Sequence, residues 1–189
     1  MKQETLQLTG GNFNNSRRKL DYYPTPRNVT IALLDFLKLP LTYTIWEPAC
    51  GNGAMSSVFK EYGYNTVETD IIHGQDYFNT FEISDAIITN PPFNLSVQFI
   101  EKALTESTVV CMLLKSQYWH AAKRQLLFEK HPPSYVLPLT WRPDFLEHER
   151  NPLQRKGAPT MEVAWSVWGI NTNCCTTCCT IYKPLTKPK

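Results

Sequence analysis

Short strand-like runs alternate along this chain with segments whose apolar residues recur at helical spacing. A short run that is apolar throughout is typical of a strand buried on both faces of a sheet, and recurrence at i, i+3 and i+4 is typical of a helix that packs on one side. The alternation predicts an α/β fold whose mainly parallel sheet is covered by helices on both faces. The expected strands are residues 44–46, 65–70, 86–88, 108–114, 135–139 and 161–168.

The expected helices follow from apolar spacing and from residues that start or stop a helix. Thr25 is expected to cap the first helix, with Pro26 at its first position. The second helix should end near Gly63, and Ser96 should cap the third. The inward-facing residues are Val29, Ala32, Leu33, Phe36 and Leu37 in the first helix, Met55, Val58 and Phe59 in the second, and Val97, Ile100 and Leu104 in the third, and residues 120–130 form a fourth.

The central expected strand is followed by Asn90-Pro91-Pro92-Phe93. Two consecutive prolines cannot donate backbone hydrogen bonds to a sheet, so the strand must stop here. Pro92 also keeps Pro91 out of helical geometry. The tetrapeptide therefore lies at the carboxyl end of a central strand, which is where open α/β sheets bind their ligands.

The chemistry of this tetrapeptide suits a planar amine. The Asn90 side-chain oxygen and the Pro91 carbonyl would accept both hydrogens of an exocyclic amino group, and the Phe93 ring would stack on the attached ring. Adenine N6 and cytosine N4 have this form. The alternative is a strand that simply ends in a proline turn, and the tetrapeptide alone does not decide between the two.

A glycine segment, Glu47-Pro48-Ala49-Cys50-Gly51-Asn52-Gly53, joins the first strand to the second helix. Small residues at such a junction let the backbone approach a ligand, and the helix amino terminus offers free N–H groups, although the third glycine of the dinucleotide pattern is missing. Asp70 follows about twenty residues later, where a doubly wound fold places a ribose-binding carboxylate. Asp76 would accept a hydrogen bond from an adenine amino group, with an ordinary turn aspartate as the alternative.

Residues 140–159 form a long polar segment between the last two expected strands. A loop of this length in a compact domain is usually functional or disordered. Aromatic residues interleaved with arginines suit a nucleic-acid surface, because rings stack on bases and guanidinium groups meet phosphates. A mobile surface loop is the alternative. The candidate substrate-binding residues are Phe93, Lys115 at the carboxyl end of a strand, and Trp141, Arg142, Arg150 and Arg155 in this loop.

Composition narrows the class of protein. A chain of 189 residues with 42% hydrophobic and 19% charged residues fits one soluble globular domain. No apolar run approaches the length of about 18 residues that a membrane span needs, and the start of the chain lacks the apolar core of a secretory signal, so we expect a cytoplasmic protein without a membrane partner. The net charge of +2 is too small to indicate a polyanionic partner by itself.

Four of the six cysteines cluster at Cys174, Cys175, Cys178 and Cys179. A cytosolic protein keeps its cysteines reduced. The cluster contains one Cys-x-x-Cys, with no second pair and no histidine at a ligand spacing. We therefore expect no metal site, and structural zinc is the alternative.

Together these residues resemble those of the S-adenosylmethionine-dependent amino-methyltransferases, and among them the small, phage-type DNA N6-adenine methyltransferases. The resemblance covers about residues 21–170, and it is carried by Asp21 to Pro26, residues 47–53, Asp70, Asp76 and residues 90–93, in this order. It implies a Rossmann-like class I methyltransferase fold with a seven-stranded, mainly parallel sheet in which one late strand runs antiparallel. It also implies methyl transfer from S-adenosylmethionine to adenine N6 in DNA, with the base flipped out or taken from a single strand.

The resemblance assigns roles to single residues. Tyr22, Tyr23, Pro24 and Thr25 would contact the methionine end of the cofactor, although Tyr22 and Tyr23 would serve equally in packing against the first helix. Asp70 would hold the ribose hydroxyls, and Asp76 would pair with the cofactor adenine. The residues lining the cofactor would include Glu47, Ala49, Cys50, Gly51, Gly53 and Asn90, and the catalytic residues that hold the target base would be Asn90, Pro91, Pro92 and Phe93.

The chain divides into a flexible arm at residues 1–20, a methyltransferase domain at residues 21–170 and a Cys/Lys-rich tail at residues 171–189. This division leaves no room for a separate target-recognition domain. Sequence specificity is therefore either slight or supplied by the loop at residues 140–159. A cytoplasmic location in a bacterial or phage-infected host cell follows from the same resemblance, and the sequence does not indicate an oligomeric state.

Other substrates and one other class of protein stay open. An Asn-Pro-Pro followed by an aromatic residue also occurs in methyltransferases that act on RNA bases, on cytosine N4 and on protein glutamine, because all of these present a planar amine. Interleaved arginines and aromatic residues favour a nucleic acid, with DNA first. A non-catalytic nucleic-acid-binding domain, with the cysteine cluster as a metal knuckle, is the alternative class. It predicts bound zinc and no affinity for S-adenosylmethionine, and the enzyme predicts the reverse.

Overall fold

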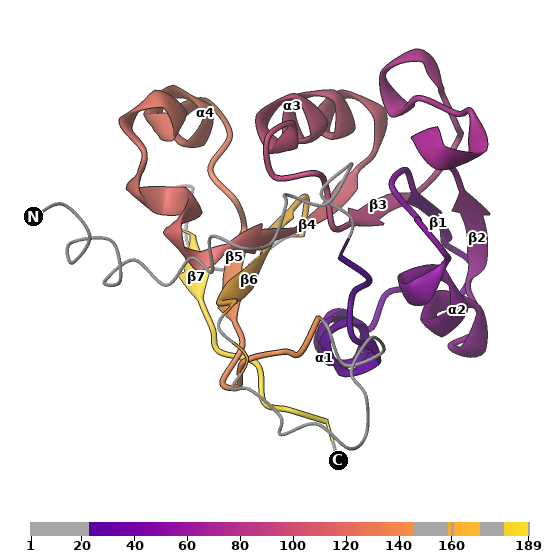
Figure 1. Cartoon of the computed structure of the whole chain (residues 1–189), viewed down its shortest axis with the longest axis horizontal. Helices are drawn as coiled ribbons and strands as arrows, with labels where there is room; N and C mark the ends of the chain where they lie inside the picture. Colours follow the sequence, from indigo (N-terminus) through magenta and orange to yellow (C-terminus); the bar gives the residue numbers. More distant parts are fainter. Residues whose placement is uncertain (1–22, 146–158, 160, 171–179, 189) are drawn as a thin grey trace, which may run out of the picture.

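The computed structural model describes residues 23–145, 159, 161–170 and 180–188. They form one seven-stranded sheet in the order β2-β1-β3-β4-β6-β5-β7 (Figure 1). β6 runs antiparallel to β4 and β5, and the other neighbouring pairs are parallel. The strands are β1 (Thr44–Glu47), β2 (Asn65–Glu68), β3 (Ala86–Thr89), β4 (Val109–Lys115), β5 (Tyr135–Pro138), β6 (Val163–Trp168) and β7 (Ile181–Tyr182). The six strands expected from the sequence are confirmed, with ends shifted by one or two residues.

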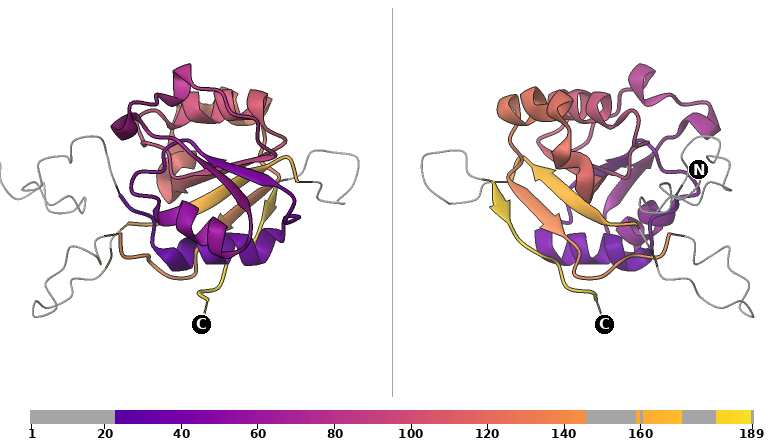
Figure 2. Two further views of the ribbon diagram at one scale, coloured as in Figure 1. Left: turned by 90° about the vertical axis from the view of Figure 1, so that its right-hand side faces the viewer. Right: turned by 60° about the vertical axis from the view of Figure 1, so that its left-hand side comes forward.

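Helices cover both faces of this sheet. α1 (Arg27–Leu37) and α2 (Ala54–Glu61) lie on one face, and α3 (Ser96–Glu106) and α4 (Gln125–Lys130) lie on the other (Figure 2). The expected helix at 120–130 is shorter, because the residues before α4 form the 3-10 helices η5 (Ser116–His120) and η6 (Ala122–Arg124). Two further 3-10 helices, η3 (Ile71–His73) and η4 (Tyr77–Asn79), follow β2. No helix in the described part of the chain is both long and apolar enough to span a membrane.

β4 shows why the central strands must be apolar throughout. Cys111 and Leu113 belong to the core cluster under α1 and α2, and Val110 and Met112 belong to the cluster under α3 and α4. All four are fully buried. Successive side chains of a strand point to opposite faces, so a strand with a covered face on each side has no solvent-facing position. The continuous apolar run therefore identified a central strand correctly.

The seventh strand comes from the C-terminal segment that the sequence analysis set apart as a tail. Ile181 and Tyr182 pair in parallel with Tyr135 and Val136 of β5, and the buried Leu185 joins the core. Residues 180–188 therefore pack on the sheet instead of lying apart from it. Two residues are too few for a strand pattern to be recognised in the sequence. The arm at residues 1–20 and the cysteine cluster lie outside the described residues.

Candidate active site

A pocket lies where β1, β2 and β3 end, at the carboxyl edge of the sheet. Its volume is about 820 Å³, a figure that includes space open to solvent. Four segments that are distant in sequence meet here. The lining residues that the sequence analysis proposed are Tyr23, Pro24, Thr25, Glu47, Ala49, Cys50, Asp70, Asp76, Asn90 and Pro92.

The glycine segment makes a tight turn between β1 and α2. Gly51 has a φ of +54° and Gly53 a φ of +76°, so both occupy the left-handed region that glycine favours. A Cβ atom at Gly53 would also lie only 3.1 Å from a carboxylate oxygen of Glu68. Neither glycine lines the pocket. Both glycines shape the turn that brings Ala49 and Cys50 to the pocket wall, and their contact with a cofactor stays a prediction.

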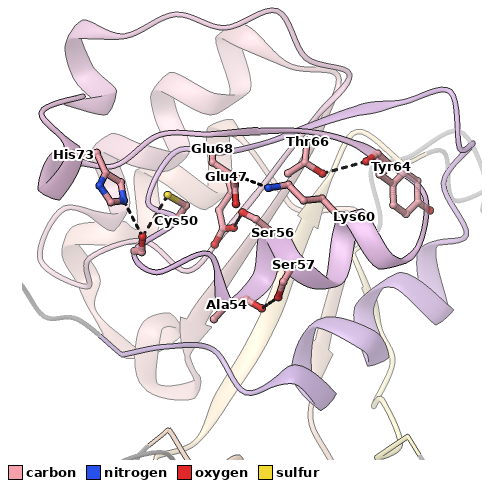
Figure 3. A network of polar contacts seen from close by, with 11 residues as sticks. Glu47, Cys50, Ala54, Ser56, Ser57, Lys60, Tyr64, Thr66, Glu68 and His73 are labelled. Atoms are coloured by element: carbon pink, nitrogen blue, oxygen red, sulfur yellow. Dashed lines mark hydrogen bonds and ion pairs between the residues drawn. The ribbon is translucent and has the colours of Figure 1, made fainter.

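The backbone of Gly51 is held on both sides of its Cα atom. Its N–H donates to Asp70 Oδ2 at 2.7 Å. Its carbonyl accepts from His73 Nε2 at 3.1 Å, and Figure 3 shows the His73 ring and this contact. The ring nitrogen must carry the proton, because a carbonyl oxygen can only accept. Asp70 Oδ1 accepts a second backbone N–H, from Ile72 at 2.9 Å. Asp70, expected to hold a ribose, thus also fixes the glycine turn, and His73 is a residue that the sequence analysis missed.

Two buried ionisable side chains, Glu47 and Cys50, line the pocket, and burial favours the neutral form of each. Burial raises the pKa of Glu47 to about 8, and the Ser56 hydroxyl donates to its carboxylate. Burial likewise raises the pKa of the Cys50 thiol to about 12. A thiol with so high a pKa is a poor nucleophile at neutral pH. Cys50 is therefore a wall of the pocket and not a reactive group.

An apolar wall that the sequence analysis missed completes the pocket. Phe78 packs against Phe99, with 5.3 Å between ring centroids, and the buried Tyr77 packs against the same ring at 4.6 Å. Ile71 is 59% exposed and Phe78 39% exposed, although both border the pocket. Exposed apolar side chains beside a pocket are typical of a binding surface for a ring.

Asp76 accepts hydrogen bonds within a turn and also lines the pocket. Its Oδ1 accepts the backbone N–H of Phe78 at 3.1 Å, and its Oδ2 accepts the side-chain amide of Asn79 at 3.0 Å. These are the contacts of an ordinary turn aspartate, which was the alternative in the sequence analysis. The residue also lines the pocket. The cofactor-binding prediction for Asp76 therefore stays open.

The Asn90 side chain is held by the segment that precedes α1. Its amide nitrogen donates to the Tyr23 carbonyl at 3.2 Å and to Thr25 Oγ1 at 3.1 Å. Thr25 does not cap α1 as expected, because the helix begins one residue later, after Pro26, and has no side-chain cap. Among the described residues, neither the Asn90 side-chain oxygen nor the Pro91 carbonyl accepts a hydrogen bond. The two acceptors proposed from the sequence are thus available to a ligand.

The turn at Phe93 is fixed by the start of α3. The Ser96 hydroxyl donates to the Phe93 carbonyl at 2.9 Å, so Ser96 supports the tetrapeptide and does not cap the helix, which has Leu95 as its N-cap. The Phe93 ring lies 6.2 Å from the Tyr23 ring, measured between centroids. The Lys115 ammonium group lies 4.1 Å from the Phe93 ring centroid. The structure therefore brings Phe93 and Lys115 together, two of the predicted substrate-binding residues.

Trp141 and Arg142 lie apart from this pocket, in a second hollow beside the ends of β4, β5 and β6. Arg142 pairs with Glu162 through two donors to one oxygen, at 2.6 and 3.1 Å. Trp141 packs against the core, and its buried ring N–H has no partner among the described residues. Tyr22, Arg150 and Arg155 lie outside the described residues. In the same described part, no three histidine, cysteine or acidic side chains are grouped as a metal site would need.

Comparison with known proteins supports the fold. No protein-family model matches the chain, and no curated protein matches it. A solved structure described as a candidate RNA methyltransferase from Pyrococcus horikoshii is 14% identical, with a TM-score of 0.58 over 83% of this chain and 90% of that one. The methyltransferase subunit of a type I restriction-modification system from Streptococcus thermophilus is also 14% identical, with a TM-score of 0.54 over 86% of this chain and 47% of the subunit.

A third structure gives the same result. The modification subunit of a candidate type I restriction enzyme from Vibrio vulnificus is 12% identical, with a TM-score of 0.52 over 77% of this chain and 44% of the subunit. The chain therefore spans less than half of either restriction-system subunit. At these identities the likeness shows the fold alone. The chain has the Rossmann-like class I methyltransferase fold, as the sequence predicted.

Proposed function

We propose that this protein transfers a methyl group from S-adenosylmethionine to the exocyclic amine of a nucleic-acid base, and that the base is adenine in DNA. The proposal rests on two hydrogen-bond acceptors that are available to a ligand. The Asn90 oxygen and the Pro91 carbonyl have no partner among the described residues, and Asn90 borders the pocket that Asp70 and Asp76 also line. A planar amine has two hydrogens for two such acceptors.

The pocket residues fit an adenosine moiety. Asp70 uses each carboxylate oxygen once, for backbone N–H groups, and a carboxylate has about four acceptor positions, so it can still accept from ribose hydroxyls. Ile71, Ile72 and Phe78, which all line the pocket, offer an apolar surface for the adenine ring. Asp76 lies two residues before Phe78 and can accept from the adenine amino group. This agreement supports S-adenosylmethionine as the cofactor.

The bound cofactor would supply a methyl group activated by its sulfonium charge. The chain's own contribution is positioning, which in well-oriented reactions can supply about 7–11 kcal/mol of the barrier. Asn90 and Pro91 would accept both amine hydrogens and so aim the nitrogen lone pair. Their oxygens would also stabilise the positive charge that develops on the nitrogen. The neutral Cys50 thiol would not compete for the methyl group.

The proposal that the substrate is a nucleic acid rests on the arrangement of Lys115 and Phe93. Lys115 lies over Phe93, so a cation suited to a phosphate stands beside a ring suited to a base. Two of the similar structures are restriction-system subunits and one is described as acting on RNA. The Asp21 to Pro26 segment favours adenine among the possible bases. Arg150 and Arg155 are proposed to contact the phosphates.

The test incubates the purified protein with methyl-labelled S-adenosylmethionine and, separately, with duplex DNA, single-stranded DNA, RNA and a protein extract. Mass spectrometry then identifies the labelled product. We expect N6-methyladenine in DNA. Methylated RNA, N4-methylcytosine or methylglutamine would replace the proposed substrate with one of the alternatives. Absence of S-adenosylmethionine binding together with bound zinc would favour a non-catalytic nucleic-acid-binding domain.

A further inference from the structure

We propose that Thr25 holds the Asn90 amide in the orientation that the Tyr23 carbonyl selects, and that it is a positioning residue for the transfer. The inference rests on the proposed function of Asn90. Thr25 is 5% exposed and lies 65 residues before Asn90. Its hydroxyl oxygen, at 3.1 Å, is one of two acceptors that the amide nitrogen reaches. The role is different from helix capping, which the structure does not show for this residue.

An asparagine amide needs such partners because its last torsion angle has no sharp preference. A half-turn about that bond exchanges the oxygen and the nitrogen. In the observed orientation both N–H groups of Asn90 are used by Tyr23 and Thr25. After a half-turn, the Asn90 oxygen would face the Tyr23 carbonyl, acceptor against acceptor, so this carbonyl selects the orientation. The Thr25 hydroxyl can donate or accept, and its contribution is to anchor the amide beside that carbonyl. The Asn90 amino group would then face the substrate amine, donor against donor, and the substrate would lose its acceptor.

The segment that holds the amide is itself stiff. Tyr23 and Thr25 each precede a proline, which restricts both to extended backbone geometry. The Tyr23 ring packs against Phe93 and against the buried Phe145, with centroid distances of 6.2 and 6.5 Å. The Tyr23 carbonyl and the Thr25 hydroxyl are therefore fixed relative to the tetrapeptide. An orienting contact works only when the acceptors cannot follow the amide as it turns.

The first experiment compares Thr25→Val with Thr25→Ser in methyl transfer. Valine keeps the shape of threonine but removes the acceptor, and serine keeps the acceptor. We expect Thr25→Val to lower kcat about tenfold or more while the Kd for S-adenosylmethionine changes less than about threefold. Thr25→Ser should keep most of the wild-type kcat. An equal loss in cofactor affinity and kcat would make Thr25 a cofactor contact and overturn the inference.

Thr30→Val is the matched control. Thr30 is fully buried in α1, close to Thr25 in sequence, and its hydroxyl has no partner among the described residues. The same substitution there removes a buried hydroxyl without touching Asn90. We expect unchanged kcat in this variant. A loss as large as that of Thr25→Val would show a general effect on packing and would contradict the orienting role.

A second readout needs neither cofactor nor substrate. In protein labelled with ¹⁵N-asparagine, the side-chain NH₂ signals of Asn90 are identified by their absence in Asn90→Ser. We expect these signals to shift in Thr25→Val and to stay in place in Thr30→Val and Thr25→Ser. Unmoved signals would overturn the inference even if the protein methylates DNA. Wild-type protein that methylates none of the acceptors would instead overturn the proposed function, which this measurement does not test.

Discussion

Polar side chains are held in different ways at the two ends of the sheet's carboxyl edge. Beside β1, β2 and β3, backbone groups hold the polar side chains: Asp70 accepts two backbone N–H groups, and Asn90 donates to a backbone carbonyl. Beside β4, β5 and β6, side chains hold one another, as in the exposed pair of Arg142 and Glu162. Backbone-held groups are suited to chemistry that depends on tenths of an ångström, and side-chain pairs can re-form around a polymer of varied shape.

Asn90→Ala tests the backbone-held end most directly and should have the largest effect. The variant removes the acceptor for the substrate amine, and loss of one such preorganised group typically costs about 100- to 1,000-fold in kcat. The other residues that line the pocket are unchanged in this variant, so calorimetry should give a Kd for S-adenosylmethionine within about threefold of wild type. Turnover near the wild-type rate would contradict the proposed role of Asn90.

Asp70→Asn should have the next largest effect. An asparagine cannot accept from both the Gly51 and the Ile72 N–H groups, and an unsatisfied buried N–H costs about 1–3 kcal/mol. We expect a corresponding loss in the free energy of unfolding, measured with urea, and an affinity for S-adenosylmethionine lowered about tenfold or more. His73→Ala removes the longer and more exposed contact to the backbone of the same glycine, and this variant is the comparison. Equal losses in the two variants would argue against a ribose contact by Asp70.

The backbone-held end was also the part that the sequence predicted best. Asn90 directly follows the apolar run of β3, and Asp70 lies about twenty residues after the glycine segment, so local patterns located both residues. The contact of Thr25 with Asn90 could not be predicted in this way, because nothing in a local pattern reports which acceptor a side chain 65 residues away will meet. The most local explanation, a helix cap, was therefore chosen for Thr25, and it was wrong.

Three residues of the site and one strand were missed in the sequence analysis for a different reason. Ile71 and Phe78 border the pocket from short 3-10 helices, which have too few residues for a hydrophobic period. His73 contacts a carbonyl, which any donor could do, so its residue type carried little information. The two-residue strand β7 lies beyond the segment that the family resemblance covered. In each case the structure is determined by tertiary contacts that local patterns do not encode.

Glu47→Gln should have a smaller effect, visible in the pH dependence of stability. Burial raises the pKa of Glu47 from its ordinary value near 4.5 to about 8 in the folded protein. Between these values the unfolded chain has released this proton and the folded protein keeps it, so the group's stabilising contribution is complete below pH 4.5 and is lost as the pH rises to about 8. The expected slope is about 1 kcal/mol per pH unit.

The measurement compares urea unfolding of wild type and Glu47→Gln at pH 5.5, 7.0 and 8.5. Glutamine can still accept from Ser56 but cannot ionise, so the difference between the two proteins isolates this group. The free energy of unfolding of wild type should fall relative to that of the variant as the pH rises. Parallel curves would mean that Glu47 is already ionised in the folded protein at pH 5.5.

Lys115→Met tests the side-chain-held end and should have the smallest effect. If Lys115 leaves the Phe93 ring for a phosphate, its loss should reduce the slope of log affinity against log salt by about one, with kcat at saturating DNA little changed. Fluorescence anisotropy with a labelled duplex gives that slope. Lys183→Met is the matched control, because Lys183 lies 5.1 Å from the Phe36 ring centroid but does not border either hollow. An equal change in both variants would reflect overall charge, so only a change confined to Lys115→Met would place a phosphate beside Phe93.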